Sequence, residues 1–322
     1  MPRTLAWADG YRLAVPASRN PGASIFVLGP NVIAGSCWCA PIRMNPLVPV
    51  VCPICSEALR RSGRSYTCQN RHNFDLSKEG YLSLLHGRNS YQQVGDDKLM
   101  VQARVRVHKL PAFQELAKAI TAFCPQVGAG YGILDIGCGD GFFLDHVARA
   151  AASPSQGVGV DISKEALAKA ARSFPGLFFV RTDASVNRLP FADASFGLVL
   201  SVFAPRPIDE IQRVLRADGF WLIATATQDH LRELREFLPL ASIGTGKLDA
   251  PTSRSYSILR NGTFNYEVPV AYHDLVSLVE MSPSIYRLRR EFGDTWSEHI
   301  PKELGVTFSF SVTLLGSAAR GG

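Results

Sequence analysis

Leu-Asp-Ile-Gly-Cys-Gly-Asp-Gly, residues 134–141, is a glycine-rich turn that directly follows a short apolar segment. The apolar residues 131–136 predict a buried strand, and residues 140–151 predict a helix. Glycine permits a tight turn between two such elements, and its missing side chain lets a ligand lie against the backbone. The turn therefore predicts an α/β domain with a ligand at the carboxyl end of this strand.

The same alternation continues on both sides of the turn. Two helices come first, at 96–109 and 112–123, and Pro111 separates them because proline cannot continue a helix. Further strands are expected at 157–160, 177–182, 196–202 and 220–226, and further helices at 164–173, 208–215 and 230–238. Strands separated by helices predict a parallel sheet with right-handed crossovers.

The spacing of the glycines narrows the choice of ligand. The dinucleotide fingerprint G-x-G-x-x-G needs glycine where this chain has Phe142, and no Gly-Lys-Ser/Thr follows that would make a P-loop. The observed pattern, G-x-G-x-G preceded by Asp135, resembles motif I of class I S-adenosylmethionine (AdoMet) methyltransferases. The resemblance implies that the turn contacts the cofactor through Asp135, Gly137, Gly139, Asp140 and Gly141.

Acids after the next two strands strengthen this resemblance. Asp135 is expected to help hold the cationic methionine end of AdoMet. Asp161 ends the second strand, where its carboxylate is expected to accept hydrogen bonds from both ribose hydroxyls. Asp183 follows the third strand and is expected to accept from the adenine amine. Taken singly, Asp161 is also consistent with an ordinary helix cap, and Asp183 with an ordinary turn residue.

A second motif lies nearer the N-terminus, where Cys52-Pro-Ile-Cys55 is followed after twelve residues by Cys68 and His72. Zinc takes four such ligands in a tetrahedron, and a two-residue gap lets both thiolates of a pair face one ion. The intervening residues suffice for a hairpin that turns at Ser62-Gly63 and returns the second pair to the first. The motif predicts a structural zinc ribbon and disfavours a catalytic zinc, because protein fills all four positions.

The ribbon is also basic. It carries Arg60, Arg61, Arg64 and Arg71, with aromatic side chains interleaved. Basic and aromatic residues together are typical of a surface that contacts RNA. The alternative is that the aromatic residues fill the small core that a metal-bound domain still needs.

The composition sets wider limits on the class of protein. The chain has 322 residues, of which 46% are hydrophobic and 19% charged, which excludes a wholly disordered chain. No apolar run is long enough for a membrane helix, and the net charge of +6 favours anionic partners only weakly. Seven cysteines, an odd number without an evident secretory signal, argue against a disulfide framework. We therefore expect a cytoplasmic protein that does not interact with membranes.

These features divide the chain into four segments. We expect an unstructured extension at 1–44, the zinc ribbon at 45–83, a linker with a helix at 84–118 and the AdoMet methyltransferase domain at 119–322. The extension is rich in arginine and poor in acids, as organelle transit peptides are. An upstream extension before a start at Met44 is the favoured interpretation.

Ribbon and turn together resemble one family, the bacterial 23S rRNA (guanine-N1)-methyltransferases. Besides the zinc ligands and the glycine turn, the motifs that carry this resemblance are Asn73-Phe74-Asp75-Leu76-Ser77-Lys78-Glu79-Gly80-Tyr81, Gly95-Asp96, Met100-Val101-Gln102-Ala103-Arg104, Arg188-Leu189-Pro190-Phe191, Phe203-Ala204-Pro205 and Met281-Ser282-Pro283. The resemblance implies a homodimeric enzyme that uses AdoMet and Zn²⁺. Its implied activity is methylation of N1 of one guanine in a 23S rRNA hairpin loop, with the paired ribbons helping to form a basic RNA cleft.

The resemblance also marks a match and two departures. His230 matches a family histidine that touches the cofactor. The family has a Gly-His-Tyr stretch whose tyrosine reaches the cofactor; this chain has Pro111-Ala112-Phe113 there, which keeps the ring and loses the hydroxyl. Gly197 stands where many relatives have Asp. These departures leave open a catalytically impaired, RNA-binding protein, whereas a small-molecule methyltransferase would leave the basic ribbon without a use.

The expected chemistry concerns a ring nitrogen. Guanine N1 becomes nucleophilic only after it loses its proton, and the base must then lie flat in a slot near the methyl group. Phe203-Ala204-Pro205 occupies the expected place, where methyltransferases of exocyclic amines carry Asn or Asp followed by Pro-Pro-Tyr. The sequence does not identify the base that takes the proton. Arg206 is a candidate for stabilising the deprotonated guanine at O6, or alternatively contacts a phosphate.

Overall fold

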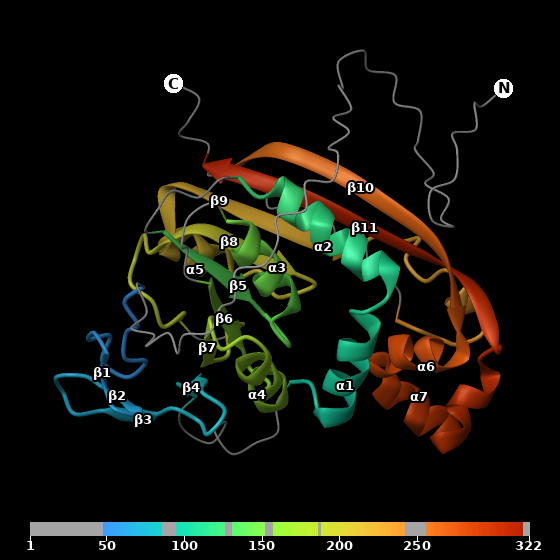
Figure 1. Cartoon of the computed structure of the whole chain (residues 1–322), viewed down its shortest axis with the longest axis horizontal. Coiled ribbons are helices and arrows are strands. Elements are labelled where there is room, and N and C mark those ends of the chain that lie inside the picture. Colours follow the sequence, from blue (N-terminus) through green and yellow to red (C-terminus); the bar gives the residue numbers. More distant parts are fainter. Residues whose placement is uncertain are drawn as a thin grey trace, which may run out of the picture.

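The structure is a computed structural model that describes residues 48–85, 95–125, 131–151, 157–185, 188–241 and 256–317. The strands of its large sheet are β4 (Leu82–Ser83), β5 (Gly132–Ile136), β6 (Gly157–Asp161), β7 (Phe178–Arg181), β8 (Phe196–Val202), β9 (Leu215–Ala226), β10 (Tyr256–Ala271) and β11 (Glu303–Ser317). They lie in the order β10-β11-β9-β8-β5-β6-β7-β4 (Figure 1). From β9 to β4 all neighbours are parallel, which confirms the Rossmann-like α/β prediction. The expectation of a purely parallel sheet is wrong at the other edge, where β11 is antiparallel to both β9 and β10.

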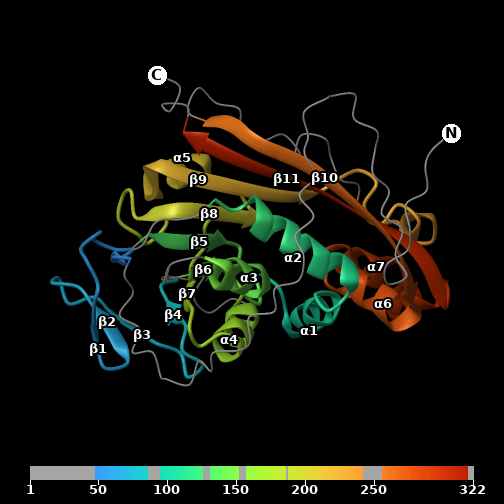
Figure 2. The ribbon, with the colours of Figure 1, turned by 45° about the horizontal axis from the view of Figure 1, so that its top comes forward.

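Helices cover both faces of this sheet. They are α1 (Lys98–Val107), α2 (Pro111–Phe123), α3 (Phe142–Ala150), α4 (Lys164–Ser173), α5 (Ile208–Val214), α6 (Tyr272–Glu280) and α7 (Ser284–Phe292). Side chains alternate across a strand, so Ile133 packs with α2, α3 and α4 on one face, while Leu134 and Ile136 pack with α5 on the other. Figure 2 shows α2, α3 and α4 on the near side of the sheet. This burial on both faces explains why the strands read as continuous apolar runs.

The small N-terminal sheet is the predicted ribbon. Its strands β1 (Arg60–Ser62), β2 (Ser65–Thr67) and β3 (Asn73–Asp75) pair antiparallel, and the hairpin turns at Gly63 as expected. The third strand was not predicted from the sequence. The chain then passes directly into β4, which pairs parallel with β7 and so extends the large sheet. Apolar ribbon residues join the core on the α5 side of that sheet.

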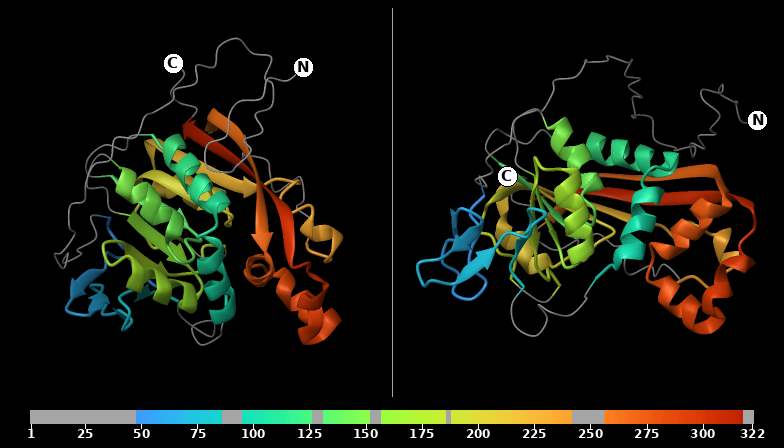
Figure 3. Two further views of the ribbon diagram at one scale, coloured as in Figure 1. Left: turned by 45° about the vertical axis from the view of Figure 1, so that its right-hand side comes forward. Right: turned by 60° about the horizontal axis from the view of Figure 1, so that its bottom comes forward.

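In the C-terminal part, the long strands β10 and β11 pair with each other, and the chain that connects them forms α6 and α7. Figure 3 shows α6 and α7 at the opposite end of the molecule from the ribbon. The predicted helix at 230–238 is wrong, because within it only Leu234–Glu236 (η2) is helical, as a short 3-10 turn. The segment is fastened to β11 instead: the N–H of Leu231 donates to the carbonyl of Thr307 at 2.7 Å, and the Glu233 carboxylate accepts from the Thr307 N–H at 2.8 Å.

Two further expectations concern membrane-spanning helices and the N-terminal segment. Among the described helices, none combines the length and the hydropathy that crossing a membrane requires. The expectations for residues 1–44 lie outside the described residues.

Candidate active site and metal centre

The glycine turn forms a cradle at the carboxyl end of β5. Gly137 has a positive φ of 69°, and a Cβ there would lie 2.7 Å from the Cβ of Ala204, so only glycine lets the loop after β8 approach the turn. Gly139 also has a positive φ, of 54°, but the nearest atom to a Cβ there would be Arg104 Cδ at 3.7 Å. The turn is thus closed on the side of residues 203–205, and a ligand can lie against Gly139.

Three carboxylates surround this cradle. Asp135, 2% exposed, has a buried Oδ1 with no hydrogen-bond partner among the described residues. Asp161 accepts from the N–H of Ser163 at 2.8 Å and from the N–H of Gly139 at 2.9 Å. Burial raises the pKa of Asp135 well above its usual range, and the negative charges of Asp161 and Asp140 raise it further. A cationic ligand beside these carboxylates would favour their ionised forms, and AdoMet carries one positive charge at its sulfonium and one at its ammonium.

Asp140 differs from the other two because a histidine side chain partners it. Nδ1 of His108 lies 3.2 Å from its carboxylate, and the His108 ring stacks on Phe142 with centroids 4.3 Å apart. Burial opposes ionisation, but His108 and then Arg104 hold the pKa of Asp140 below its usual value. Asp183 lies just beyond β7, where its Oδ1 accepts from the N–H of Ser185 at 3.0 Å. This turn is compatible with either reading of Asp183, turn residue or adenine contact.

Phe113 and His230 meet in one aromatic cluster beside the cradle. Phe113 is 2% exposed, and its ring centroid lies 5.6 Å from that of Phe310 on β11. His230 lies 4.9 Å from Phe310, and its Nδ1 accepts from the N–H of Ser309. Phe203, at the end of β8, completes the cluster at 5.7 Å from Phe310. Burial, with a smaller contribution from Arg235, lowers the pKa of His230 to about 3, so its imidazole is neutral at pH 7.

Helix α1 supplies two further residues to which the sequence reasoning assigned no role. Arg104 lies over Gly139, and His108 pairs with Asp140 from the C-terminal end of the helix. The helix is anchored at its other end, where the Ser163 hydroxyl donates to the carbonyl of Asp96 at 2.6 Å. The sequence held a partial signal, because Arg104 belongs to a motif of the family resemblance, but nothing in its spacing showed which turn it faces.

The metal-ligand residues form a compact group in the ribbon. Cys55 Sγ lies 3.6 Å from Cys68 Sγ, and His72 Nδ1 lies 3.5 Å from Cys52 Sγ and 3.4 Å from Cys68 Sγ. A tetrahedral zinc with ordinary bond lengths separates its ligands by about 3.4–3.8 Å. All four ligand atoms lie within 4.8 Å of one another, so the donor set fits a structural zinc.

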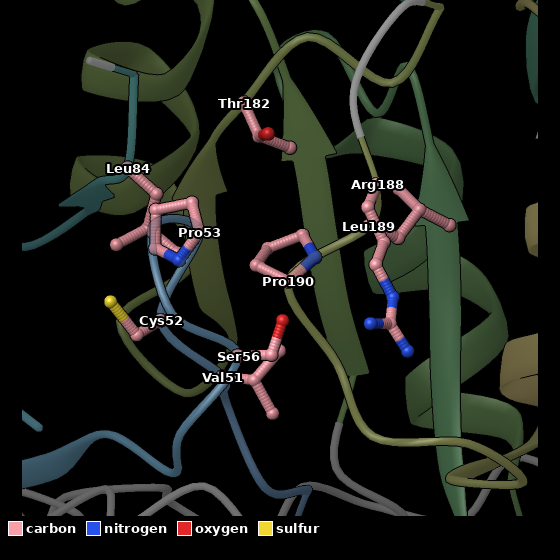
Figure 4. A pocket seen from close by; sticks show the side chains of 9 residues that line it. All are labelled: Val51, Cys52, Pro53, Ser56, Leu84, Thr182, Arg188, Leu189 and Pro190. Atoms are coloured by element: carbon pink, nitrogen blue, oxygen red, sulfur yellow. The ribbon is translucent and has the colours of Figure 1, made fainter.

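The start of the ribbon is bonded to the segment that precedes β8 of the large sheet. The N–H of Val51 donates to the carbonyl of Pro190 at 2.9 Å, one residue before the first zinc ligand. A pocket of about 140 Å³ lies at this junction (Figure 4), with Pro53 and Pro190 on its walls and Thr182 at its edge. Thr182 directly precedes Asp183, so the ribbon and the expected adenine end of the cofactor site share one region of the protein.

The four ribbon arginines are all exposed but differ in their contacts. Arg64 donates to the carbonyl of Ser77 at 2.5 Å and so ties the hairpin turn to the chain after β3. Arg61 donates to the carbonyl of Gly63 at 3.1 Å. Arg60 on β1 and Arg71, which lies between β2 and β3 with a positive φ of 64°, make no such side-chain bond to another described residue. Arg206 is half-buried in the loop after β8, beyond Phe203 and Ala204.

Comparisons with known proteins agree with this geometry. A family model described as RlmA, N-terminal, a zinc ribbon, matches residues 50–89, and one described as a methyltransferase domain matches residues 133–219. A Micromonospora griseorubida protein assigned to the 23S rRNA (guanine-N(1)-)-methyltransferases is 33% identical over 262 residues, 73% of this chain and 86% of that protein. The 23S rRNA (guanine(748)-N(1))-methyltransferase of Streptomyces fradiae is 35% identical over 206 residues, 63% of this chain and 72% of that protein. The chain belongs to the family of 23S rRNA (guanine-N1)-methyltransferases.

Proposed function

We propose that this protein transfers a methyl group from AdoMet to N1 of a guanine in a hairpin loop of 23S rRNA. The observation that carries the proposal is the cradle at Gly139, where one carboxylate oxygen of the buried Asp135 has no hydrogen-bond partner among the described residues and is free to face a cationic cofactor. The substrate is inferred from the activity for which the relatives are named and from the exposed basic ribbon. An rRNA substrate also supports a cytoplasmic location.

The target base is proposed to stack on Phe203. This residue has a positive φ of 54°, which a bulky side chain adopts only under strain, and it is held there by an N–H bond to the carbonyl of Ala224 at 2.9 Å. Phe203 is 41% exposed although its ring packs against Phe143 and Phe310. The next residue, Ala204, touches the cofactor turn at Gly137. An exposed aromatic ring beside the cofactor is a suitable platform for a flat base.

Each residue at the site is then proposed to have a separate role in the methyl transfer. AdoMet supplies an electrophilic methyl group on a positively charged sulfur. Asp135 stabilises positive charge at the cofactor site, and Phe203 orients the base. Arg206, three residues beyond Phe203, is proposed to stabilise the negative charge that O6 of guanine gains when N1 loses its proton. His230 is a poor base for that proton, because its pKa is about 3 and its Nδ1 already accepts from Ser309.

RNA binding is proposed to use Arg60 and Arg71, with Arg61 and Arg64 beside them. These side chains are exposed on a rigid metal-bound sheet, which favours contact with a phosphate backbone. We further propose a homodimer in which two ribbons face one RNA. Sedimentation of the purified protein tests this part separately, since a monomer at working concentrations would contradict the dimer and leave the methyl transfer intact.

The comparisons give no support to the alternative of a catalytically impaired RNA-binding protein, because the relatives are named as methyltransferases. The ring of Phe113 is packed into the aromatic cluster, and the acids and glycines of the cofactor turn are all in place.

Primer extension on a 23S rRNA hairpin fragment tests the function. After incubation with AdoMet, we expect reverse transcription to stop at one loop guanine, because a methyl on N1 blocks base pairing. The stop should vanish when that guanine is replaced by adenine.

Phe203→Ala should slow methylation about tenfold or more, since stacking of a base on an aromatic ring contributes about 1–3 kcal/mol. Phe237→Ala is the matched control, because Phe237 is also 41% exposed but lies outside the cluster. Absence of any stop with the wild-type protein would refute the proposal.

A further inference from the structure

Arg104 lies beside Gly139 of the proposed cofactor turn. It lies on α1 with 25% of its side chain exposed, and its Cδ is the nearest atom to the open side of Gly139. Its positive charge favours the ionised forms of Asp140 and Asp161, although burial still raises the pKa of Asp161 above its usual value. Arg104 is therefore a cation placed against the part of the turn that is open to a ligand.

The guanidinium of Arg104 is only partly used by the protein. Its Nη2 donates to the carboxylate of Asp96 and, at 3.2 Å, to the carbonyl of Met281. Its Nε is buried and has no hydrogen-bond partner among the described residues. A buried donor without a partner is costly, and in native proteins such an atom calls for an acceptor that the chain itself does not supply.

The amino-acid end of AdoMet carries one positive and one negative group, which complement Asp135 and Arg104. Its ammonium suits the unpartnered oxygen of Asp135, and its carboxylate suits the unpartnered N–H of Arg104. We propose that Arg104 binds the carboxylate of AdoMet through Nε, and so makes the enzyme select a cofactor with an intact amino-acid end. Arginine suits this task because its planar fork of donors matches a carboxylate. The inference rests on AdoMet being the cofactor and is independent of which guanine is methylated.

A purely structural role makes a different prediction. Through Asp96 and Met281, Arg104 also ties α1 to the loop between α6 and α7. If that were its whole role, replacing it would weaken every ligand of the site to the same extent, because the damage would lie in the protein. Recognition of a carboxylate weakens only those ligands that carry one.

Calorimetry with two ligands separates these roles. AdoMet and decarboxylated AdoMet share the sulfonium, the ammonium and the adenosine, and differ in the carboxylate. We expect the wild-type protein to bind AdoMet about 10–100-fold more tightly, as a charged hydrogen bond in a buried site implies. Arg104→Gln should lose most of this preference while retaining its affinity for the decarboxylated compound. Arg104→Lys, which keeps the charge but lacks Nε, should retain only part of the preference.

Arg106→Gln is the matched control. Arg106 lies on the same helix and makes a comparable tie, donating to the Ser277 hydroxyl at 2.9 Å and to Glu280 at 3.2 Å, but it does not face the turn. This variant should keep the full preference for AdoMet. An unchanged preference in Arg104→Gln would overturn the inference, as would an equal loss for both ligands in Arg104→Gln and Arg104→Lys. If the wild-type protein bound neither compound, the proposed function itself would be refuted.

Discussion

Nδ1 of His108 lies 3.2 Å from the carboxylate of Asp140, and each side chain is only 8% exposed. The pair joins the end of α1 to the start of α3, across the glycine turn at 137–141. Because it is buried, removal of one partner leaves the other without compensation, which costs far more than the loss of a surface pair. The pair therefore holds the helix that carries Arg104 in place over the cofactor turn.

We expect His108→Ala to lower the free energy of unfolding by about 3 kcal/mol at pH 7. The pKa of Asp140 is lowered in the folded protein, so this stabilisation is present above the ordinary pKa of an aspartate and is lost as the pH falls through the lowered value. Urea unfolding of wild type and variant at pH 7 and in acid measures both effects. His273→Ala is the control, because its pair with Asp274 is exposed and should change stability by less than about 0.5 kcal/mol. Equal effects of the two substitutions would contradict the assignment.

Removal of zinc should unfold the ribbon and leave the large sheet folded. The four ligands flank a sheet of three short strands that has little core of its own, so metal binding and ribbon folding share one free energy. Elemental analysis should give one zinc per chain, and Cys68→Ala should lose it. Cys124→Ala, at a cysteine outside the ligand group, should retain the metal. A Cys68→Ala protein that keeps one zinc per chain would show that the ligands are wrongly identified.

AdoMet should bind more tightly as the pH rises. The pKa of Asp135 is raised by burial and by two neighbouring carboxylates, so the free protein holds a proton there that a cationic ligand displaces. Affinity should increase as the pH rises through the raised pKa and become constant above it, with release of protons detectable by calorimetry in buffers of different ionisation enthalpy. S-adenosylhomocysteine, which lacks the sulfonium charge, should show a weaker dependence, and Asp135→Asn should remove it. The same pH dependence in Asp135→Asn and wild type would assign the proton to another group.

The sequence predicted those parts of the protein that depend on local spacing. The zinc ligands and the alternation from β5 to β9 are of this kind, because a glycine turn, a ligand pair or an apolar period is complete within a few residues. The helix expected at 230–238 failed because Leu231 and Glu233 bond to Thr307, more than seventy positions away. The role of Arg104 was missed for the same reason, since its partner Met281 and its neighbour Gly139 are distant in sequence.

RNA affinity should depend on the charge of the ribbon. Of its four arginines, Arg64 supports the hairpin through the carbonyl of Ser77, so the cleanest test replaces only Arg60 and Arg71. Each phosphate that an arginine neutralises releases counterions, so Arg60→Gln/Arg71→Gln should weaken binding of the hairpin. The slope of log affinity against log salt should fall by about 0.7–0.9 for each phosphate that is no longer neutralised. Filter binding at several salt concentrations measures this slope.

Arg149→Gln is the control for the RNA titration, because Arg149 is an exposed cation on α3, outside the ribbon, that pairs with Asp145. It should leave the slope unchanged, and zinc content and AdoMet affinity should stay at wild-type values in both proteins. If the ribbon serves only folding or dimerisation, the double variant will keep both its RNA affinity and its salt slope. That result would move the RNA surface away from the ribbon, because two exposed charges on a rigid metal-bound sheet cannot bind phosphates and yet contribute nothing to the release of counterions.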